Sequence, residues 1–591
     1  MANSFGSLYV GASGLQGASH GLNTTANNLT NVNTEGYVRE QVVYEDRDYR
    51  KIGIAAVSNQ YSGLGVQVGT IVHARDIFLD KAYRTESGRY SFYNASSEAV
   101  QEVYTQLQES DGEAFKDAIA DFEEAFEEFA KDPSDTVNQN LVLQKASLFL
   151  SRAAAVQDGL EDYQTIINSK IQEDIDRINE IGAEMVELNK KIMTIEAAGV
   201  EKAMDLRDQR DLLLDELSGL TRMTYREDVQ GVVHVDIEGT EFVDEVTYHE
   251  IGTLKNKRTG FITPYWTHLS DVDNEDYYEV FNLDNVSAEV NSDIGEIKAL
   301  LMARGDDWAS YLDFYDADGE YLDSDTYESN LANSIMMNTE AELDTLIHQI
   351  VTSINDLFSP LTTVADAYSD AASITYVDDD GNTVEFDSTT KILDVDNCSV
   401  GTDGELPPRE LFVRTGCERY TQIEATVTDS DGNTETVTLY VYNEEDPDDT
   451  STCYTLKSCS INEELQKQES YLPHRIYSDQ DSIDYELGAA MSALWSAQDF
   501  NLNPSDTTPC GFNGFYVKWI GEIANTGSVY ATTTASLQGT KEEIEYSRQG
   551  VIGVSSDEEL TIMIKYQSAY NAASRYINVI NEMIEHLLTS L

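Results

Sequence analysis

Basic residues are scarce in this chain, which has 38 Lys and Arg against 107 Asp and Glu and a formal net charge of −69. A surface this acidic repels phosphate, so the composition excludes nucleic acid as a partner, and we interpret the charge as a means of solubility. Long apolar runs are missing too, because no stretch approaches the roughly 18 residues that indicate a membrane-spanning helix. The length of 591 residues predicts about two to four domains.

Motifs of the common enzyme classes are absent as well. The pair His249 and Glu250 has no second histidine at Thr253, where a metalloprotease helix would need one. Neither a nucleophile elbow nor a phosphate-binding loop occurs, and among 107 acidic residues a close carboxylate pair has no diagnostic value. The five cysteines form no Cys-x-x-Cys pair; we interpret them as thiols, with a bridge between Cys453 and Cys459 as the alternative. We predict no enzyme, no cofactor and no metal.

Three acidic turns leave one alternative to that prediction. The pattern Asp-x-Asp-Gly occurs at 316–319, 378–381 and 429–432. Alternating carboxylates around a glycine can bind calcium, but none of the three continues to the Glu that an EF-hand loop has at its twelfth position. Asp-Gly is also a common hairpin turn. Plain turns are the favoured interpretation, and calcium sites remain the alternative.

Apolar residues at helical spacing mark both ends of the chain. Near the N-terminus leucines are spaced seven residues apart, at Leu8, Leu15, Leu22 and Leu29. Glycines in the same segment oppose a helix by about 1 kcal/mol each relative to alanine, so it should hold only against a partner. Residues 560–591 contain neither Pro nor Gly and have an apolar repeat of their own. The spacing predicts a two-helix stalk made from both termini, with two unrelated core helices as the alternative.

The chain between the ends divides by pattern. Apolar residues from Leu160 to Ile195 recur at a mean step of 3.5 residues, the coiled-coil period. An aromatic stripe at helical spacing between Phe115 and Phe129 indicates core. Leu361–Gln480 is different, with 26 acidic against 7 basic residues and short alternating runs around Asp-Gly turns, as in β-hairpins. The predicted fold class is α+β, multidomain and elongated, with coiled-coil-like terminal helices, a helical-bundle rod and an inserted acidic β-rich domain.

These patterns predict the domain limits. Residues 1–75 should form an N-terminal assembly helix with a β and loop segment, paired with a C-terminal assembly helix at 549–591. A helical rod domain with a small β part is expected at 76–360, completed by 481–548. The variable β-rich insertion is expected at 361–480.

Two motifs resemble those of the bacterial flagellar rod, hook and hook-associated axial proteins. The segment Ala26–Tyr37, with the sequence Ala-Asn-Asn-Leu-Thr-Asn-Val-Asn-Thr-Glu-Gly-Tyr, is similar to the N-terminal motif of that family, which usually has Pro or Thr at the position of Glu35. Gly553–Glu559 and Tyr566–Tyr570 are similar to the C-terminal motif of the hook-associated members, although Ser555 and Ser556 replace the usual Asn-Leu. The resemblance covers about 1–358 and 485–591.

The resemblance implies a structural subunit of the bacterial flagellum that connects the hook to the filament and permits filament assembly. It implies contacts with copies of the same chain, the hook protein, a second hook-associated protein and a small helical export chaperone. It also implies secretion by the flagellar type III export system to the extracellular hook–filament junction, whereas the missing secretory signal alone would indicate the cytoplasm. The rival hypothesis is a surface-displayed binding module, an adhesin with a calcium-dependent acidic β domain.

The residues expected to carry assembly lie on the two terminal helices and in the N-terminal motif. The expected subunit-assembly residues are Leu8, Leu15, Leu22, Leu29, Asn28, Asn31, Gly36, Tyr37, Tyr566, Ala569, Tyr570, Ala573, Ile577, Ile580, Ile584 and Leu587. By resemblance, the export chaperone should contact the C-terminal stripe of Tyr566, Tyr570, Ile577, Ile580, Ile584 and Leu587. We further expect both terminal helices to be largely unfolded in the free monomer and to fold on assembly.

Overall fold

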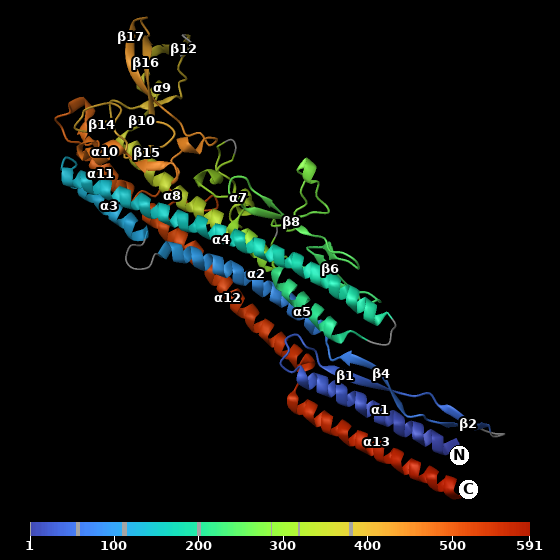
Figure 1. Cartoon of the computed structure of the whole chain (residues 1–591). Helices are drawn as coiled ribbons and strands as arrows, with labels where there is room; N and C mark the ends of the chain where they lie inside the picture. The colour runs from blue at the N-terminus through green and yellow to red at the C-terminus, as the bar shows by residue number, and fades with distance from the viewer. Residues whose placement is uncertain are drawn as a thin grey trace.

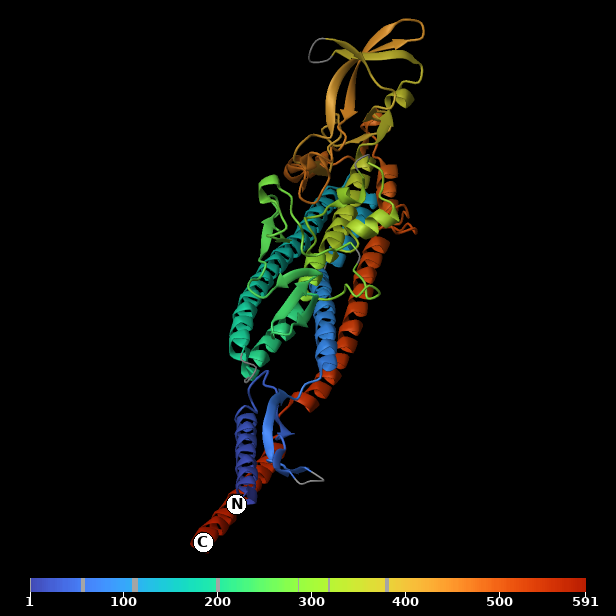
Figure 2. The ribbon, with the colours of Figure 1, turned by 90° about the vertical axis from the view of Figure 1, so that its right-hand side faces the viewer.

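The chain forms an elongated α+β molecule in the computed structural model, which confirms the predicted fold class. Both termini lie at one end, a six-stranded sheet lies at the other, and long helices connect them (Figures 1 and 2). The structure describes residues 2–54, 59–108, 115–197, 202–284, 286–316, 319–377 and 382–590.

The end with the termini is a pair of helices beside a β-hairpin. Helix α1 (Ala2–Thr30) runs against α13 (Ser556–Ser590), and the two chain ends lie side by side, so the helices are antiparallel (Figure 1). Strands β1 (Glu40–Asp46) and β4 (Val66–His73) pair antiparallel over α1, with a bulge between Val43 and Tyr44. The hairpin is extended by β2 (Arg50–Ile54) and β3 (Asn59–Ser62).

The rod is a bundle of long helices. Its elements are α2 (Ile77–Gln108), α3 (Phe115–Lys131), α4 (Thr136–Glu196), α5 (Met204–Leu220) and α12 (Phe512–Ile552). Asp135 caps α4 by accepting the N–H of Val137 at 2.9 Å, which satisfies a free donor of the first turn. The coiled-coil repeat from Leu160 to Ile195 lies within α4 and is buried up to Ile192. The aromatic stripe of α3 is buried against α4 and α11, as predicted.

Small β units and shorter helices line the rod. The sheet β5 (Met223–Glu227), β6 (Val233–Ile237) and β7 (Thr240–Val243) is followed by the pair β8 (Ile251–Lys255) and β9 (Ile262–Trp266) and by the short helix η1 (Val272–Asn274). Then come α6 (Glu296–Arg304), η2 (Tyr311–Phe314), α7 (Ser324–Asn330) and α8 (Ile335–Phe358). Helix α8 contacts α4, α6 and α11, so it belongs to the bundle.

The far end is a six-stranded antiparallel sheet in the order β10-β13-β17-β16-β11-β12. Its elements are β10 (Leu361–Thr363), α9 (Val364–Ala367), β11 (Ala371–Val377), β12 (Thr383–Glu385), β13 (Lys391–Leu393), β16 (Tyr420–Asp429) and β17 (Thr434–Tyr442). The predicted hairpin around Asp431 and Gly432 is the β16–β17 hairpin, and Gly432 has the positive φ of 85° that this turn needs.

The remainder of the predicted insertion packs on the rod. It comprises β14 (Ser399–Val400), β15 (Phe412–Arg414), η3 (Thr450–Thr452), β18 (Cys459–Ile461), α10 (Glu463–Lys467), η4 (Glu469–Tyr471), β19 (Arg475–Ile476) and η5 (Tyr477–Asp479), followed by α11 (Tyr485–Leu494). Phe412, Tyr454 and Leu465 belong to the same hydrophobic cluster as α3 and α4. Residues 361–480 therefore divide into a projecting sheet and a part that shares the core of the rod, and the domain limits stay a prediction.

Candidate assembly interface

Small residues, not leucines, make the closest approach between α1 and α13. A Cβ atom added at Gly11 would lie 2.8 Å from Ile577 Cγ1, and one at Gly21 would lie 2.6 Å from the ring of Tyr566. At Gly14 the added atom would lie 3.7 Å from Ala573 Cβ, an ordinary contact. The glycines that weaken α1 as an isolated helix therefore allow α13 to approach it closely.

These small residues form a heptad repeat of their own, in alternating steps of three and four: Gly11, Gly14, Ala18, Gly21, Thr25 and Asn28. All of them are buried except Gly14, which is half-buried. The predicted leucines Leu8, Leu15, Leu22 and Leu29 follow one position later and are half-buried. Sequence reasoning did not single out this line of small residues, and the role of the leucines in assembly stays a prediction. The spacing of the glycines is the sequence signal that could have identified the residues of α1 that approach α13.

The hairpin covers a second side of α1. Tyr44 OH donates to the carbonyl of Gly17 at 3.0 Å, and Ser13 Oγ accepts the N–H of Val66 at 3.3 Å. A Cβ atom at Gly17 would lie 3.3 Å from the Tyr44 ring. Helix α1 thus lies between α13 and the β1–β4 hairpin, and its glycines Gly11, Gly17 and Gly21 lie at close approaches to these neighbours.

The polar residues of the N-terminal motif connect α1 to the start of α13. Asn28 Nδ2 donates to Glu559 Oε2 at 3.2 Å and to the carbonyl of Glu40 at 2.9 Å. Asn28 Oδ1 accepts the Tyr37 hydroxyl at 2.9 Å and the N–H of Glu40 at 2.9 Å. Arg39 Nε lies 2.8 Å from Glu559 Oε1. Asn28 and Tyr37 therefore lie together, and the buried carboxylate of Glu559 has both a charged and a neutral partner.

The other two residues predicted from this motif shape the turn after α1. Asn31 Nδ2 donates to the carbonyl and to the side-chain oxygen of Asn27, both at 3.1 Å, which closes the end of the helix. Gly36 has a φ of 75° and lies against Leu212 of α5. A glycine is favoured there because other residues rarely adopt that backbone conformation.

The predicted stripe of α13 is divided by this packing. Tyr566, Ala573, Ile577, Ile580 and Ile584 are buried or half-buried, whereas Ala569, Tyr570 and Leu587 are exposed. Large apolar side chains remain exposed over the rest of the helix, among them Leu560, Ile564, Tyr576, Val579, Met583 and Leu588. One partner helix therefore covers only part of the apolar surface of α13.

An ion-pair network holds three rod helices together at the end of the rod next to the terminal pair. Arg548 of α12 contacts Asp80 at 2.8 Å and Asp215 at 2.5 Å. Arg84 pairs with Asp215 and Arg75 with Asp80, each at 2.6 Å. Because all five side chains are largely buried and each charge has an opposite partner, the network gives α2, α5 and α12 a defined geometry at this end of the rod.

Asp208 of α5 and His73, which lie where the N-terminal segment meets the rod, are both uncharged over a range of pH. Asp208 Oδ2 accepts the N–H of Val38 at 2.9 Å, and Asp208 Oδ1 lies 3.4 Å from His73 Nε2. Burial raises the pKa of Asp208 to about 7 and lowers the pKa of His73 to about 4. Between those values both groups are neutral, which removes the cost of two desolvated charges.

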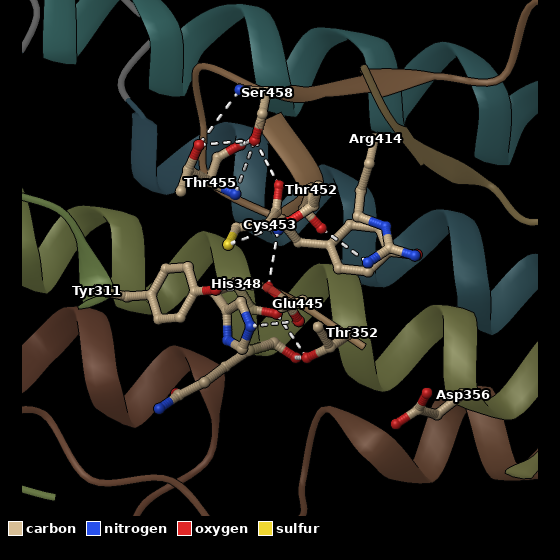
Figure 3. Close-up of polar contacts among 12 residues, drawn as sticks. Tyr311, His348, Thr352, Asp356, Arg414, Glu445, Thr452, Cys453, Thr455 and Ser458 are labelled. Atoms are coloured by element: carbon tan, nitrogen blue, oxygen red, sulfur yellow. Dashed lines mark hydrogen bonds and ion pairs between the residues drawn. The ribbon is translucent and has the colours of Figure 1, made fainter. Parts of the chain in front are cut away.

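A polar cluster fastens the far β region to α8 (Figure 3). Glu445, which follows β17, accepts hydrogen bonds from the Tyr311 hydroxyl and from the N–H of Tyr454 at 2.9 Å, and lies 3.2 Å from His348 Nε2. The rings of His348 and Tyr311 stack at 3.8 Å. Burial alone would oppose ionisation, but the bonds from His348, Tyr311 and Tyr454 lower the pKa of Glu445 to about 2.

Three buried acids of α8 hold the loops around it. Glu340 accepts the N–H of Ala309 at 3.0 Å, and Glu342 accepts Asn503 Nδ2 at 2.9 Å. Asp344 accepts the N–H of Tyr311 at 3.1 Å and that of Leu456 at 2.6 Å. Burial raises the pKa of Glu340 and of Glu342 to about 8 and that of Asp344 to about 6. Sequence reasoning missed these residues because acidic positions are too common here to stand out.

Of the three Asp-x-Asp-Gly turns, the one at 429–432 shows whether its carboxylates are available for calcium. Asp429 Oδ1 accepts the N–H groups of Asp431 and Asn433 at 2.9 and 2.8 Å, and Asp429 Oδ2 accepts Asn433 Nδ2 at 2.8 Å. Both oxygens of the Asp429 carboxylate therefore accept hydrogen bonds within the turn itself, as in a plain hairpin turn. Residues 317–318 and 378–381 of the other two turns lie outside the described residues. The five cysteines are free thiols, so Cys453 and Cys459 form no bridge.

Comparison with known proteins agrees with the resemblance at the two ends and extends it. Residues 8–37 match the model of the flagella basal body rod protein family, and residues 549–590 match the C-terminal model of flagellar basal body rod FlgEFG proteins. Residues 100–360 match the helical domain of the flagellar hook-associated protein FlgK. In the described part of the chain, no helix has the length and apolar character needed to cross a membrane.

Individual relatives agree with these matches. Flagellar hook-associated protein 1 of Bacillus subtilis is 22% identical over 100% of this chain and 99% of that protein. The proteins of the same name from Escherichia coli and Salmonella typhimurium are 24% and 23% identical, each over 35% of this chain and 37% and 36% of their own lengths. The flagellar hook junction protein FlgK from Burkholderia pseudomallei aligns with 80% of this chain and all of that structure, at 13% identity and a TM-score of 0.45. Three flagellar family models match separate parts of this chain and a relative matches it from end to end, so the chain is similar over its whole length to the flagellar hook-associated protein 1 (FlgK) family, a family of structural flagellar proteins.

Proposed function

We propose that this chain is the subunit that connects the hook to the filament, and that its terminal helices assemble with neighbouring subunits. The observation that carries the proposal is the apolar surface of α13 that α1 leaves open. Ile564, Val579 and Met583 are 63%, 52% and 61% exposed. Soluble monomers rarely expose this much apolar surface on one element, so the surface indicates an interface.

The exposed side chains require more than one neighbour. At about 100° of rotation per residue, Ile564 and Met583 lie on different sides of the helix. A single additional helix would cover one side and leave the other in water. A tube of helices around α13 would cover both, which supports helical self-assembly and contacts to different proteins above and below. The hook protein and a second hook-associated protein are the proposed longitudinal partners.

The proposed export chaperone would compete with α1. Its expected stripe includes Tyr566, Ile577 and Ile580, and these are the side chains that face α1 or are buried beside it. A chaperone bound there would keep α1 and α13 apart until export through the flagellar type III system. The terminal helices could then pair only after release outside the cell. The rival adhesin hypothesis has no supporting observation.

The test is complementation of a strain that lacks the gene. We expect the deletion strain to have hooks without filaments and to release flagellin into the medium, and the wild-type gene to restore filaments. The double variant Val579→Glu, Met583→Glu should be exported and keep the melting temperature of the rod, yet fail to restore filaments, because charges would enter the proposed interface.

Val529→Glu is the matched control, since Val529 is 54% exposed on α12, away from the terminal pair. It should restore filaments. Filaments of normal length on the deletion strain would contradict the junction role. Filaments of normal length with the Val579, Met583 double variant would contradict the role of the exposed face.

A further inference from the structure

A histidine on the small sheet of the rod is surrounded by carboxylates from three different segments. His234 lies on β6, between β5 and β7. Asp228 comes from the turn after β5, and Glu245 from the segment after β7. One possible ligand atom of each of these three residues lies within 4.8 Å of the other two. Segments that are separate in the sequence thus place one imidazole and two carboxylates together.

The imidazole of His234 has less hydrogen bonding than its burial leads one to expect. The residue is 9% exposed, and its Nδ1 atom is buried with no hydrogen-bond partner among the residues that the structure describes. Nδ1 lies 3.7 Å from Glu241 Oε1, and Nε2 lies 4.0 Å from Asp228 Oδ2. Both separations are too long for a hydrogen bond. Buried polar side chains are generally satisfied, so this ring calls for an explanation.

The distances fit ligands of a common ion. Zinc binds imidazole nitrogen and carboxylate oxygen at roughly 2.0–2.2 Å, so two of its ligands are about 3–4 Å apart. The Nε2 atom and Asp228 Oδ2 are at the upper end of that range. Glu245 has a ligand atom within 4.8 Å of those of His234 and Asp228, and its exposed side chain is free to complete the set.

Asp228 is already oriented for this role. Its Oδ1 atom accepts the N–H groups of Gln230 at 2.8 Å and Val232 at 2.9 Å. These two bonds hold the carboxylate and leave Oδ2 directed toward His234. Glu241 faces the opposite nitrogen of the ring. Metal-binding histidines commonly donate their second N–H to a carboxylate, and Glu241 is placed to accept it.

We propose that His234 Nε2, Asp228 Oδ2 and the carboxylate of Glu245 bind a divalent transition-metal ion, Zn²⁺ or Mn²⁺, with Glu241 orienting the imidazole. One nitrogen and two carboxylates suit these ions better than Ca²⁺, which takes six to eight oxygen ligands. The ion would fasten the turn after β5 and the segment after β7 to the central strand. This structural site does not depend on the proposed junction function.

One basic residue faces the same site. Arg226 of β5 pairs in register with His234, so the two side chains lie on the same face of the sheet. Its guanidinium would repel a cation, although the residue is exposed and can turn toward water. Removing this charge should therefore tighten metal binding, and removing a ligand should weaken it.

The test is titration of the metal-free full-length chain with Zn²⁺ by calorimetry, in millimolar Mg²⁺ so that the many exposed carboxylates are occupied. We expect one zinc site per chain and a rise in melting temperature with zinc. Asp228→Asn keeps an oxygen for the N–H groups of Gln230 and Val232 but replaces Oδ2 by an amide donor. It should raise the zinc dissociation constant at least tenfold, as should His234→Ala, while Arg226→Ala should lower it.

His586→Ala is the matched control, because His586 is an exposed histidine on α13. It should bind zinc as the wild type does. Circular dichroism of each variant shows whether it is folded, and Asp228→Asn is the variant that keeps the turn intact. Absence of zinc binding by the wild type, or an unchanged dissociation constant in folded Asp228→Asn, would overturn the proposal.

Discussion

Helices α4 and α13 are both long, but they bury their side chains very differently. In α4 buried residues recur along the whole helix, from Gln139 to Ile192, and they belong to one continuous core. In α13 only Glu559 and Ile580 are fully buried, and large apolar side chains face outward between them and beyond. The rod therefore completes its own core within one chain, and the terminal pair does not.

The two regions also differ in what makes the contact. In the rod, large rings pack together: Phe122 lies 4.9 Å from Phe126 and 5.4 Å from Phe149, between ring centroids. In the terminal pair, glycines let two backbones approach, and Asn28 bonds to Glu559 across them. Large buried side chains contribute most of the stability of a monomer, whereas close backbone contact contributes mainly a defined geometry.

The largest expected effect is a cavity in the core of the rod. Phe122→Ala removes a ring that contacts Phe126, Phe149 and Trp495, and should lower the free energy of unfolding of the monomer by about 3–5 kcal/mol. Urea denaturation followed by circular dichroism measures it. Ile580→Ala is the comparison, and should leave the same transition within about 0.5 kcal/mol. Equal losses for the two variants would mean that the terminal pair belongs to the folding unit of the rod.

The next effect is the pH dependence of the rod. Glu340, Glu342 and Asp344 have higher pKa values folded than unfolded, so folding takes up protons. Their contribution is complete below the unfolded pKa of about 4 and is lost as the pH rises toward 8. The melting temperature of the monomer should therefore be higher at pH 5 than at pH 8. Glu342→Gln should flatten this profile, and a profile rising from pH 5 to pH 8 would contradict the protonated state of these acids.

Two glycine variants of α1 distinguish the steric effect of close contact with α13 from the effect of helix propensity on stability. In Gly21→Ala the new methyl group would meet the Tyr566 ring at 2.6 Å, so the assembled form should lose about 1–3 kcal/mol of stability per chain. Gly14→Ala should instead stabilise it by up to about 1 kcal/mol, because the methyl group finds room beside Ala573. Disassembly of isolated hook–filament structures in urea measures both. The same sign for the two variants would refute the small-residue packing.

The smallest expected effect in the monomer is at the exposed face of α13. Val579→Ser removes an apolar side chain that contacts water in the free chain, so the free energy of unfolding should change by less than about 0.5 kcal/mol. The same substitution should weaken assembly, because the side chain becomes buried there under the proposed model. The two readouts are thermal unfolding of the monomer and filament length on the complemented strain. A change in the monomer alone would place Val579 in an intramolecular contact.

The sequence was sufficient for those features that repeat over many residues. The period of α4 and the Asp-Gly hairpin of β16 and β17 follow from local spacing, and both are present in the structure. The close contacts of the α1 glycines with α13 were not predicted, because leucines attract attention as core residues while the partner helix approaches the glycines. Helical spacing defines a repeat along α1. The size of the side chains on the partner helix decides which residues of that repeat contact it.

Contacts between distant segments could not be predicted in the same way. Glu445 meets Tyr311 and His348 across about a hundred residues, and no local pattern indicates that encounter. The packing of part of residues 361–480 against the rod has no local signal in the sequence for the same reason. Phe412 and Tyr454 join the rod through tertiary packing, although the composition of their segment resembles that of the projecting sheet.

Hydrogen exchange on a verified monomer tests whether the terminal pair is completed only by neighbouring subunits. We expect amides up to about Asn33 and beyond about Leu560 to exchange within seconds, while those from Leu160 to Ile192 stay protected. In assembled hook–filament structures, the terminal amides should become protected as well. Slow exchange at both termini in the monomer, equal to that of α4, would show that the pair is stable by itself and would contradict folding on assembly.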